Sequence, residues 1–140
     1  MNNKTFWIGF VVVYVVMQAL GFVIHEVMMG DTYEELASIF RPEAEMNDMM
    51  WMMMVSGAVT MYMFCYIFTI GYEGKGIIEG VRFGALVAFL MAGALAIDVH
   101  VIFPVPANVA TIWLVSGFVS FMVAGAIFAA IYKPDTAAQE

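Results

Sequence analysis

The sequence predicts an all-α integral membrane protein in which four transmembrane helices form an up-down bundle. Of the 140 residues, 64% are hydrophobic and 12% are charged, whereas soluble domains carry about 25% charged residues. Four long apolar runs follow one another, and helices satisfy the backbone hydrogen bonds that lipid cannot. We therefore expect a single domain over residues 1–140, with spans at about residues 6–29, 48–71, 77–103 and 107–132.

The first span is long enough to cross a hydrocarbon core of about 30 Å at a rise of about 1.5 Å per residue. It follows Lys4, exceeds the usual length of the apolar part of a signal peptide, and is not followed by a small-residue cleavage site. We expect it to remain as an uncleaved helix.

Residues 30–40 join the first two spans and combine acids with apolar side chains at helical spacing. This pattern predicts a short amphipathic helix that lies along the membrane surface. Asp31 is expected to cap its start, because an Asp side chain can accept from a free backbone N–H group there. The helix should end at Arg41, because a residue before proline disfavours helical geometry.

Small residues predict how the helices pack. The third span carries Gly84, Ala88 and Ala92 at a spacing of four residues, and the fourth carries Ser116 and Ser120 on one stripe. Helices in lipid associate where small side chains let their backbones approach closely. The third and fourth spans should therefore form the tightest pair.

Positive charges predict the orientation. Lys4, Lys75, Arg82 and Lys133 fall on the side of both termini, whereas Arg41 alone falls on the other side. Because cytoplasmic loops are enriched in Lys and Arg, we expect a multi-pass protein of the bacterial inner (plasma) membrane with both termini in the cytoplasm. The amphipathic helix would then be periplasmic.

The residues with the most distinctive chemistry are expected near the periplasmic side. His25 and Glu26 close the first span, and Asp98 and His100 stand near the end of the third. Ionisable groups at membrane depth cost free energy and commonly mark function. Imidazole and carboxylate ligands suit zinc or copper(II), so these four residues are candidate metal ligands, with copper or zinc as the candidate cofactor.

Methionines strengthen the case for copper, because thioether sulfur is a ligand of copper(I). At about 100° per residue, however, Asp98 and His100 point about 200° apart, so a regular helix cannot direct both toward one ion. Two alternatives stay open: a structural role at the interface, and a proton relay through Glu26, Asp98 and the histidines. The methionines on this side are Met28, Met29, Met46, Met49, Met50, Met52, Met53 and Met54.

Several other functions lack support in the sequence. Five Lys and Arg residues in total argue against nucleic-acid binding, and the lone Cys65 excludes an intrachain disulfide. No Ser-His-Asp or Cys-His arrangement can form on one side of the membrane, so we name no catalytic residue and favour a non-enzymatic protein. An enzyme that acts on lipid stays open as an alternative, without a motif in the sequence. The turn at residues 72–76 lacks the full phosphate-loop pattern, and Glu79 is instead expected to pair with Arg82 on one helical face.

Two stretches resemble a known family. Residues 40–46, Phe-Arg-Pro-Glu-Ala-Glu-Met, and residues 71–84, which run from Gly-Tyr-Glu-Gly-Lys-Gly to Val-Arg-Phe-Gly, are similar to parts of small four-helix bacterial inner-membrane proteins that have no assigned activity. The resemblance covers about a fifth of the chain and implies a fold rather than a function.

Two functions follow as hypotheses. In the first, the protein is a non-enzymatic accessory or interaction subunit of a membrane assembly, with the bilayer and either a second copy or another membrane protein as partners. In the alternative, it is a metal-handling or proton-relay membrane protein that uses the cluster of His25, Glu26, Asp98 and His100 together with the methionines.

Overall fold

The structure, a computed structural model, describes residues 3–134. This part of the chain is 84% helical and has no strand, which confirms the all-helical prediction. It contains four helices long and apolar enough to cross a membrane, as the four apolar runs predict. Their bounds are Lys4–Met28, Glu43–Ile70, Ile77–Ile102 and Ala107–Ile131.

The first long helix changes its hydrogen-bond pattern near its end. Helix α1 (Asn3–Phe22) continues as the π-helix η1 (Val23–Met28), and the short helix α2 (Gly30–Glu35) follows after one residue. The expectation that Asp31 caps α2 is wrong: the capping position is Met29 and no side chain caps it. The physical reason is that η1 runs almost directly into α2, so α2 has no free start. Residues 36–39 form turns and not further helix.

Helix α3 (Glu43–Ile70) starts directly after Pro42, five residues before the expected start of the second span at residue 48. Its first turn carries Glu43 and Glu45, and acids there are favoured by the positive end of the helix dipole. The third long helix consists of α4 (Ile77–Ala88), the π-helix η2 (Phe89–Gly93) and α5 (Ala94–Ile102). The fourth is α6 (Ala107–Ile131).

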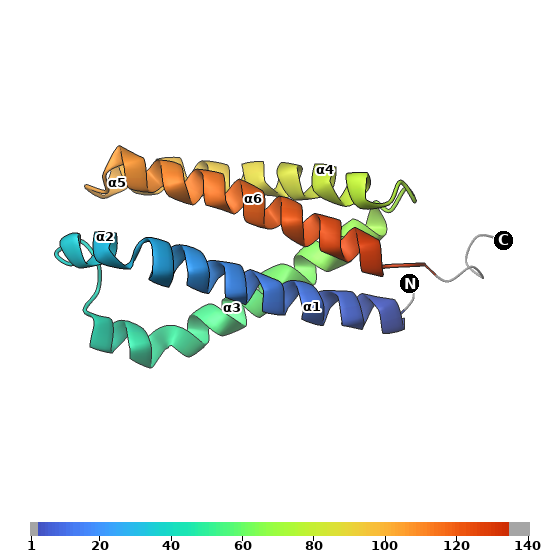
Figure 1. Ribbon diagram of the computed structural model, residues 1–140, viewed down its shortest axis with the longest axis horizontal. Coiled ribbons are helices and arrows are strands. Elements are labelled where there is room, and N and C mark those ends of the chain that lie inside the picture. The colour runs from blue at the N-terminus through green and yellow to red at the C-terminus, as the bar shows by residue number, and fades with distance from the viewer. Residues whose placement is uncertain (1–2, 135–140) are drawn as a thin grey trace.

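The helices are arranged unevenly. Figure 1 shows α4 and α5 running alongside α6, with α1 next to α6 and α3 crossing obliquely. The start of α1, the loop before α4 and the end of α6 lie at one end of the molecule. Helix α2 and the connection from α5 to α6 lie at the other end, where the first half of α3 diverges from the remaining helices.

The closest pair is α4 with α6, as the small residues predict. Gly84 lies against the backbone of α6, and a Cβ atom added there would stand 2.8 Å from the Cα atom of Met122. Gly80 and Gly125 face each other so closely that a Cβ on either would overlap the carbonyl oxygen of the other. Glycine is therefore required at this crossing because the two backbones touch.

Most of the core lies at the end that holds the described start of α1 and the loop before α4. Phe128 of α6 stacks edge-on against Phe6 and Phe68, with ring centroids 6.0 and 5.5 Å apart. Tyr132 closes this cluster beside Phe128. A smaller cluster at the other end contains Met29, and the first half of α3 contributes no buried side chain to either cluster.

Candidate functional site

The end of the molecule formed by η1, α2 and α6 holds a hydrogen-bonded cluster of three side chains, which we call the Tyr33 cluster: His25, Tyr33 and Trp113. The indole Nε1–H of Trp113 donates to the Tyr33 hydroxyl oxygen at 2.8 Å. The same hydroxyl lies 2.6 Å from Nδ1 of His25, whose ring stacks on the tyrosine at a centroid separation of 6.0 Å. Tyr33 therefore connects η1 and α2 to α6.

Burial sets the protonation of Tyr33. Loss of solvent raises the pKa of its phenol above the usual value of 10.0, and the hydrogen bond from Trp113 opposes this while the negative charge of Glu26 adds to it. The hydroxyl consequently stays protonated at neutral pH. It can also donate toward the sulfur of Met29 at 3.6 Å, so the cluster is well supplied with acceptors.

His100 and Asp98 have different surroundings. Nδ1 of His100 lies 2.6 Å from the carbonyl oxygen of Val105, so this nitrogen carries the proton and donates it. The bond ties the end of α5 to the connection that leads into α6. Asp98 is exposed, and it makes no hydrogen bond or ion pair with any residue from 3 to 134.

The four expected metal ligands thus divide into separate surroundings. His25 is engaged by Tyr33 and His100 by a backbone carbonyl, while Glu26 and Asp98 are exposed. Within residues 3–134, no group of three or more His, Cys, Asp or Glu side chains could hold a metal ion. A metal site on these four residues stays a prediction and would need ligands of another kind, such as thioether sulfur.

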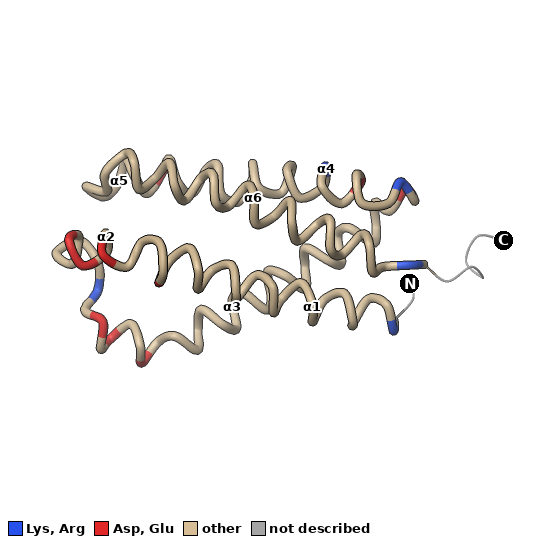
Figure 2. Tube along the Cα trace, in the orientation of Figure 1, with Lys and Arg blue, Asp and Glu red and all other residues tan. Residues whose placement is uncertain are grey.

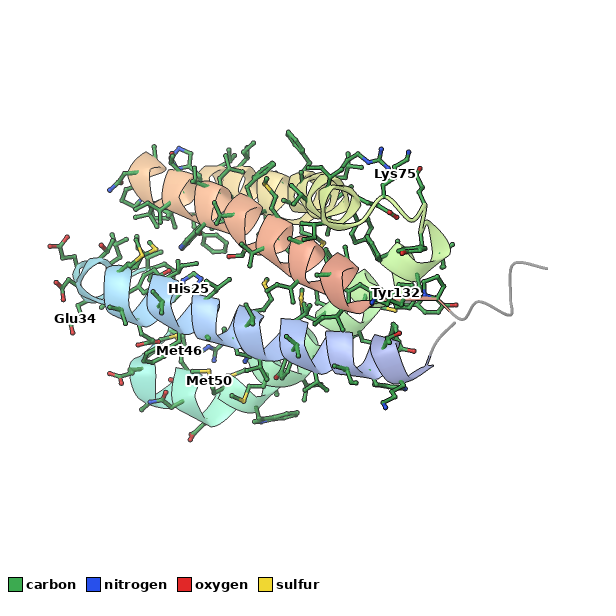
Figure 3. All side chains as sticks on the ribbon, turned by 45° about the vertical axis from the view of Figure 1, so that its right-hand side comes forward. His25, Glu34, Met46, Met50, Lys75 and Tyr132 are labelled. Atoms are coloured by element: carbon green, nitrogen blue, oxygen red, sulfur yellow. The ribbon has the colours of Figure 1, made fainter. Side chains whose placement is uncertain are left out.

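The methionines of α3 are such ligands. Met46 and Met50 are one helical turn apart and are 40% and 38% exposed. In Figure 3 both lie on the side of α3 that faces α1. Gly57, further along the same side, meets Gln18 and Tyr14 of α1, so the two helices touch there and separate toward the methionines.

The opposite end of the molecule carries a second polar arrangement, the charged loop, which consists of residues 73–76 together with Glu79 and Arg82. Glu79 is only 3% exposed, and its two carboxylate oxygens accept the backbone N–H groups of Glu73 and Lys75 at 2.6 and 2.7 Å. Gly74 and Gly76 permit this wrapping through φ angles of +76° and +69°, which favour glycine.

The expected pair of Glu79 with Arg82 is therefore wrong. The Glu79 side chain points into the loop because the backbone amides of the loop offer two donors. Arg82 binds Glu73 at 2.8 Å instead. Lys75 also binds Glu73, at 2.6 Å. These two cations, which donate hydrogen bonds to the carboxylate, lower the pKa of Glu73 below its ordinary value.

Sequence reasoning missed two features of these sites and one of the crossing between α4 and α6. The bond between Trp113 and Tyr33 joins residues 80 positions apart, and no local pattern signals it. Gly80 could have been found, since it stands four residues before Gly84 in the same small-residue series. The buried position of Glu79 could not have been found, because its carboxylate oxygens accept from backbone N–H groups of a loop.

Comparison of the chain with protein-family models, curated proteins and solved structures finds no significant match. The resemblance in residues 40–46 and 71–84 stays a prediction.

Proposed function

We propose that the protein is a non-enzymatic accessory or interaction subunit of a bacterial inner-membrane assembly. In this proposal the four long helices cross the membrane as an up-down bundle with both termini in the cytoplasm. Helix α2, the Tyr33 cluster and the start of α3 lie on the periplasmic side. The charged loop lies on the cytoplasmic side.

The observation that carries the proposal is the exposure of the first half of α3. Every residue from 41 to 56 is exposed, including Trp51 at 59% and Met53 at 68%. The rest of α3 packs normally, with Met61, Phe64, Cys65 and Phe68 buried. A helix that buries one face along its second half and no side chain along its first half leaves a surface that a partner helix can cover.

Asp98 supports the same proposal. It lies within the third long helix, among exposed apolar neighbours such as Leu95 at 63% and Val101 at 76%. Ionisable residues in membrane-spanning helices usually face the bundle or pair with another group. Here the described part of the chain supplies no pair, so a partner that donates a hydrogen bond or a positive charge would satisfy the carboxylate.

The distribution of charge supports the orientation. Figure 2 shows most of the Lys and Arg at the end that holds the start of α1, the loop before α4 and the end of α6, next to the acids of that loop. Most acids collect around α2 and the start of α3, where Arg41 also lies. This asymmetry is the one expected for termini in the cytoplasm. The acidic end also disfavours a second copy as the partner of α3, because like charges would meet.

Photocrosslinking in native membranes tests the proposal. A photoreactive amino acid at Met53 should yield a discrete protein adduct, and the same probe at Val115 of α6, which is 56% exposed, should not. The mass of the adduct separates a second copy, 15.5 kDa, from a different protein. Adducts with lipid alone at both positions would contradict the proposal.

A second candidate function, copper handling, is favoured by one specific observation: two exposed thioethers one turn apart on the side of α3 that diverges from α1. Purified protein titrated with copper(I) under reducing conditions should then bind the ion, and Met46→Leu with Met50→Leu should weaken binding. Met63→Leu, at an exposed position further along α3, is the control. His25→Ala and His100→Ala test the predicted imidazole ligands, and binding unchanged in all these variants would exclude this candidate.

A further inference from the structure

A pocket of about 180 Å³ lies between α5 and α6, next to the connection that joins them. Its lining residues form one stripe on each helix, because they follow one another at helical spacing. On α5 they are Ala96, Ile97 and His100. On α6 they are Ala107, Ala110, Thr111 and Leu114. The three alanines create the space, since longer side chains on these two stripes would fill it.

Two polar side chains line this pocket, and both have already used their donors. Nδ1 of His100 donates to the carbonyl oxygen of Val105 at 2.6 Å. The Thr111 hydroxyl donates to the carbonyl oxygen of Ala107 at 2.7 Å. A neutral imidazole has one donor and one acceptor, and a hydroxyl has one donor and two lone pairs. These side chains are therefore left with acceptors alone, namely Nε2 of His100 and the hydroxyl oxygen of Thr111.

The size and the remaining walls of the pocket suit a small apolar body. All of its other lining side chains are aliphatic. Its volume is sufficient for one six-membered ring, since an engineered apolar cavity of about 150 Å³ binds benzene. A hydroxyl group in hydrocarbon lacks an acceptor, so a lipid-soluble molecule that carries one would gain a hydrogen bond on entering the pocket. A hydrocarbon of the same shape would gain none.

We propose that the pocket between α5 and α6 binds a lipid-soluble phenol or alcohol of about the size of one six-membered ring, whose hydroxyl group donates to Nε2 of His100. Nε2 is the stronger of the two acceptors, because an imidazole nitrogen is more basic than a hydroxyl oxygen. A molecule without a donor gains no hydrogen bond from these side chains. The proposal requires neither a protein partner of α3 nor copper.

Fluorine NMR titration of the purified full-length chain in detergent tests the class of ligand. The probes are 4-fluorophenol and 4-fluorotoluene, which have nearly the same shape and differ by a hydroxyl in place of a methyl group. Partition of each probe into empty micelles is measured separately and subtracted, and a pH of about 8 keeps imidazoles neutral. We expect the phenol to bind about 3- to 10-fold more tightly, which is the ratio for one neutral hydrogen bond.

Two variants test the acceptor. His100→Asn keeps a side-chain donor near the position of Nδ1 for the carbonyl of Val105 but removes Nε2, so the preference for the phenol should fall to nearly equal binding. Thr111→Val has the same shape, removes the weaker acceptor of the same pocket and should keep the preference. Loss of the preference in Thr111→Val alone would contradict the role given to His100.

A third variant tests the space itself. Ala107 lines the pocket and is exposed, so Ala107→Leu can be accommodated and should fill part of the volume. Ala19→Leu is the matched control, because Ala19 is an exposed alanine of α1 that does not line the pocket. Binding of both probes should weaken in Ala107→Leu and stay unchanged in Ala19→Leu.

Three further results would overturn the proposal: equal binding of the two probes by the unaltered chain, an unchanged preference in His100→Asn, or unchanged binding of both probes in Ala107→Leu. Because the purified chain is measured alone, failure to find a neighbour of α3 leaves these outcomes unaffected. Conversely, loss of the preference for the phenol would not bear on crosslinking at Met53.

Discussion

Three side chains make hydrogen bonds that connect separate segments of the chain. Tyr33 joins η1 and α2 to α6 through His25 and Trp113. His100 ties the end of α5 to the following connection, and Glu79 holds the loop before α4. Each satisfies donors or acceptors that would otherwise be left without a partner among the described residues. Loss of any one should therefore cost more than removal of an exposed polar group.

Tyr33→Phe removes the acceptor of the Trp113 indole N–H while keeping the aromatic ring. We expect the free energy of unfolding to fall by about 1–2 kcal/mol, the usual cost of leaving a partly buried donor unpaired. Equilibrium unfolding in mixed micelles measures it. Tyr66→Phe is the control, since Tyr66 is 39% exposed and its hydroxyl makes no hydrogen bond with residues 3–134. Equal losses in the two variants would contradict the role given to Tyr33.

Glu79→Leu leaves the backbone N–H groups of Glu73 and Lys75 without their acceptor in a partly buried position. The expected loss in unfolding free energy is about 2–3 kcal/mol, and Glu79→Gln, which keeps one acceptor oxygen, should lose less. Glu45→Gln serves as the comparison, because its exposed pair with Arg41 on α3 should contribute about 0.5 kcal/mol or less. A Glu79→Leu variant as stable as Glu45→Gln would show that the loop does not depend on this carboxylate.

The two cations at the charged loop give Glu73 a pH dependence. The pKa of Glu73 lies below its ordinary value of 4.5, because Lys75 and Arg82 donate hydrogen bonds to it. A lowered folded-state pKa means that the stabilisation is complete above the unfolded-state value and is lost as the pH falls through the folded-state value. Carbon-13 chemical shifts of the carboxylate in a pH titration should show this, with the pKa returning toward 4.5 in Arg82→Gln.

At the scale of elements, contact between α4 and α6 dominates the packing. Small residues allow the two backbones to touch along Gly80, Gly84 and Gly125, whereas α3 meets α4 only near the loop that joins them. Helix α3 instead crosses α1 near Gly57, where the Tyr14 hydroxyl donates to the carbonyl oxygen of Met54 at 3.2 Å. The bundle is thus a tight pair with two more loosely attached helices.

Gly84→Ala should separate this tight pair. The added Cβ would overlap the carbonyl oxygen of Phe121 and stand 2.8 Å from the Cα of Met122, and neither backbone atom can move cheaply. We expect a loss of about 1–3 kcal/mol in unfolding free energy, as for other overpacked sites. Gly21→Ala in α1 meets nothing within 4 Å and should stabilise the helix by about 0.5–1 kcal/mol. The same unfolding assay should therefore give a loss of unfolding free energy for Gly84→Ala and a gain for Gly21→Ala.

At the scale of the whole molecule, the two ends differ in charge, with an acidic end around α2 and the start of α3 and a more basic end that holds the start of α1, the loop before α4 and Lys133. Bilayer insertion should follow this asymmetry. The acidic end carries the exposed first half of α3.

Reporter fusions check the orientation. A reporter that is active only in the periplasm should be active when fused within residues 36–42 and inactive when fused within residues 72–76 or after Lys133. The reverse pattern, or the same activity at the first two sites, would contradict both the topology and the partner surface. Replacing Lys75 and Arg82 by Gln should raise the fraction of inverted molecules, because positively charged loops are kept on the cytoplasmic side.

The sequence by itself determined the helical class, the four apolar helices and the close pairing of α4 with α6. These follow from hydropathy and the spacing of small residues such as Gly84 and Ala88, which are local properties. Only the tertiary structure decided which partners the polar side chains bind. Glu79 accepts from loop amides, Arg82 donates to Glu73, and Tyr33 accepts from Trp113, which is 80 residues away in the sequence. The partner of a polar side chain depends on which groups lie near it in space. The exposure of the first half of α3 is also a tertiary result, since its apolar composition alone does not tell whether protein or lipid covers it.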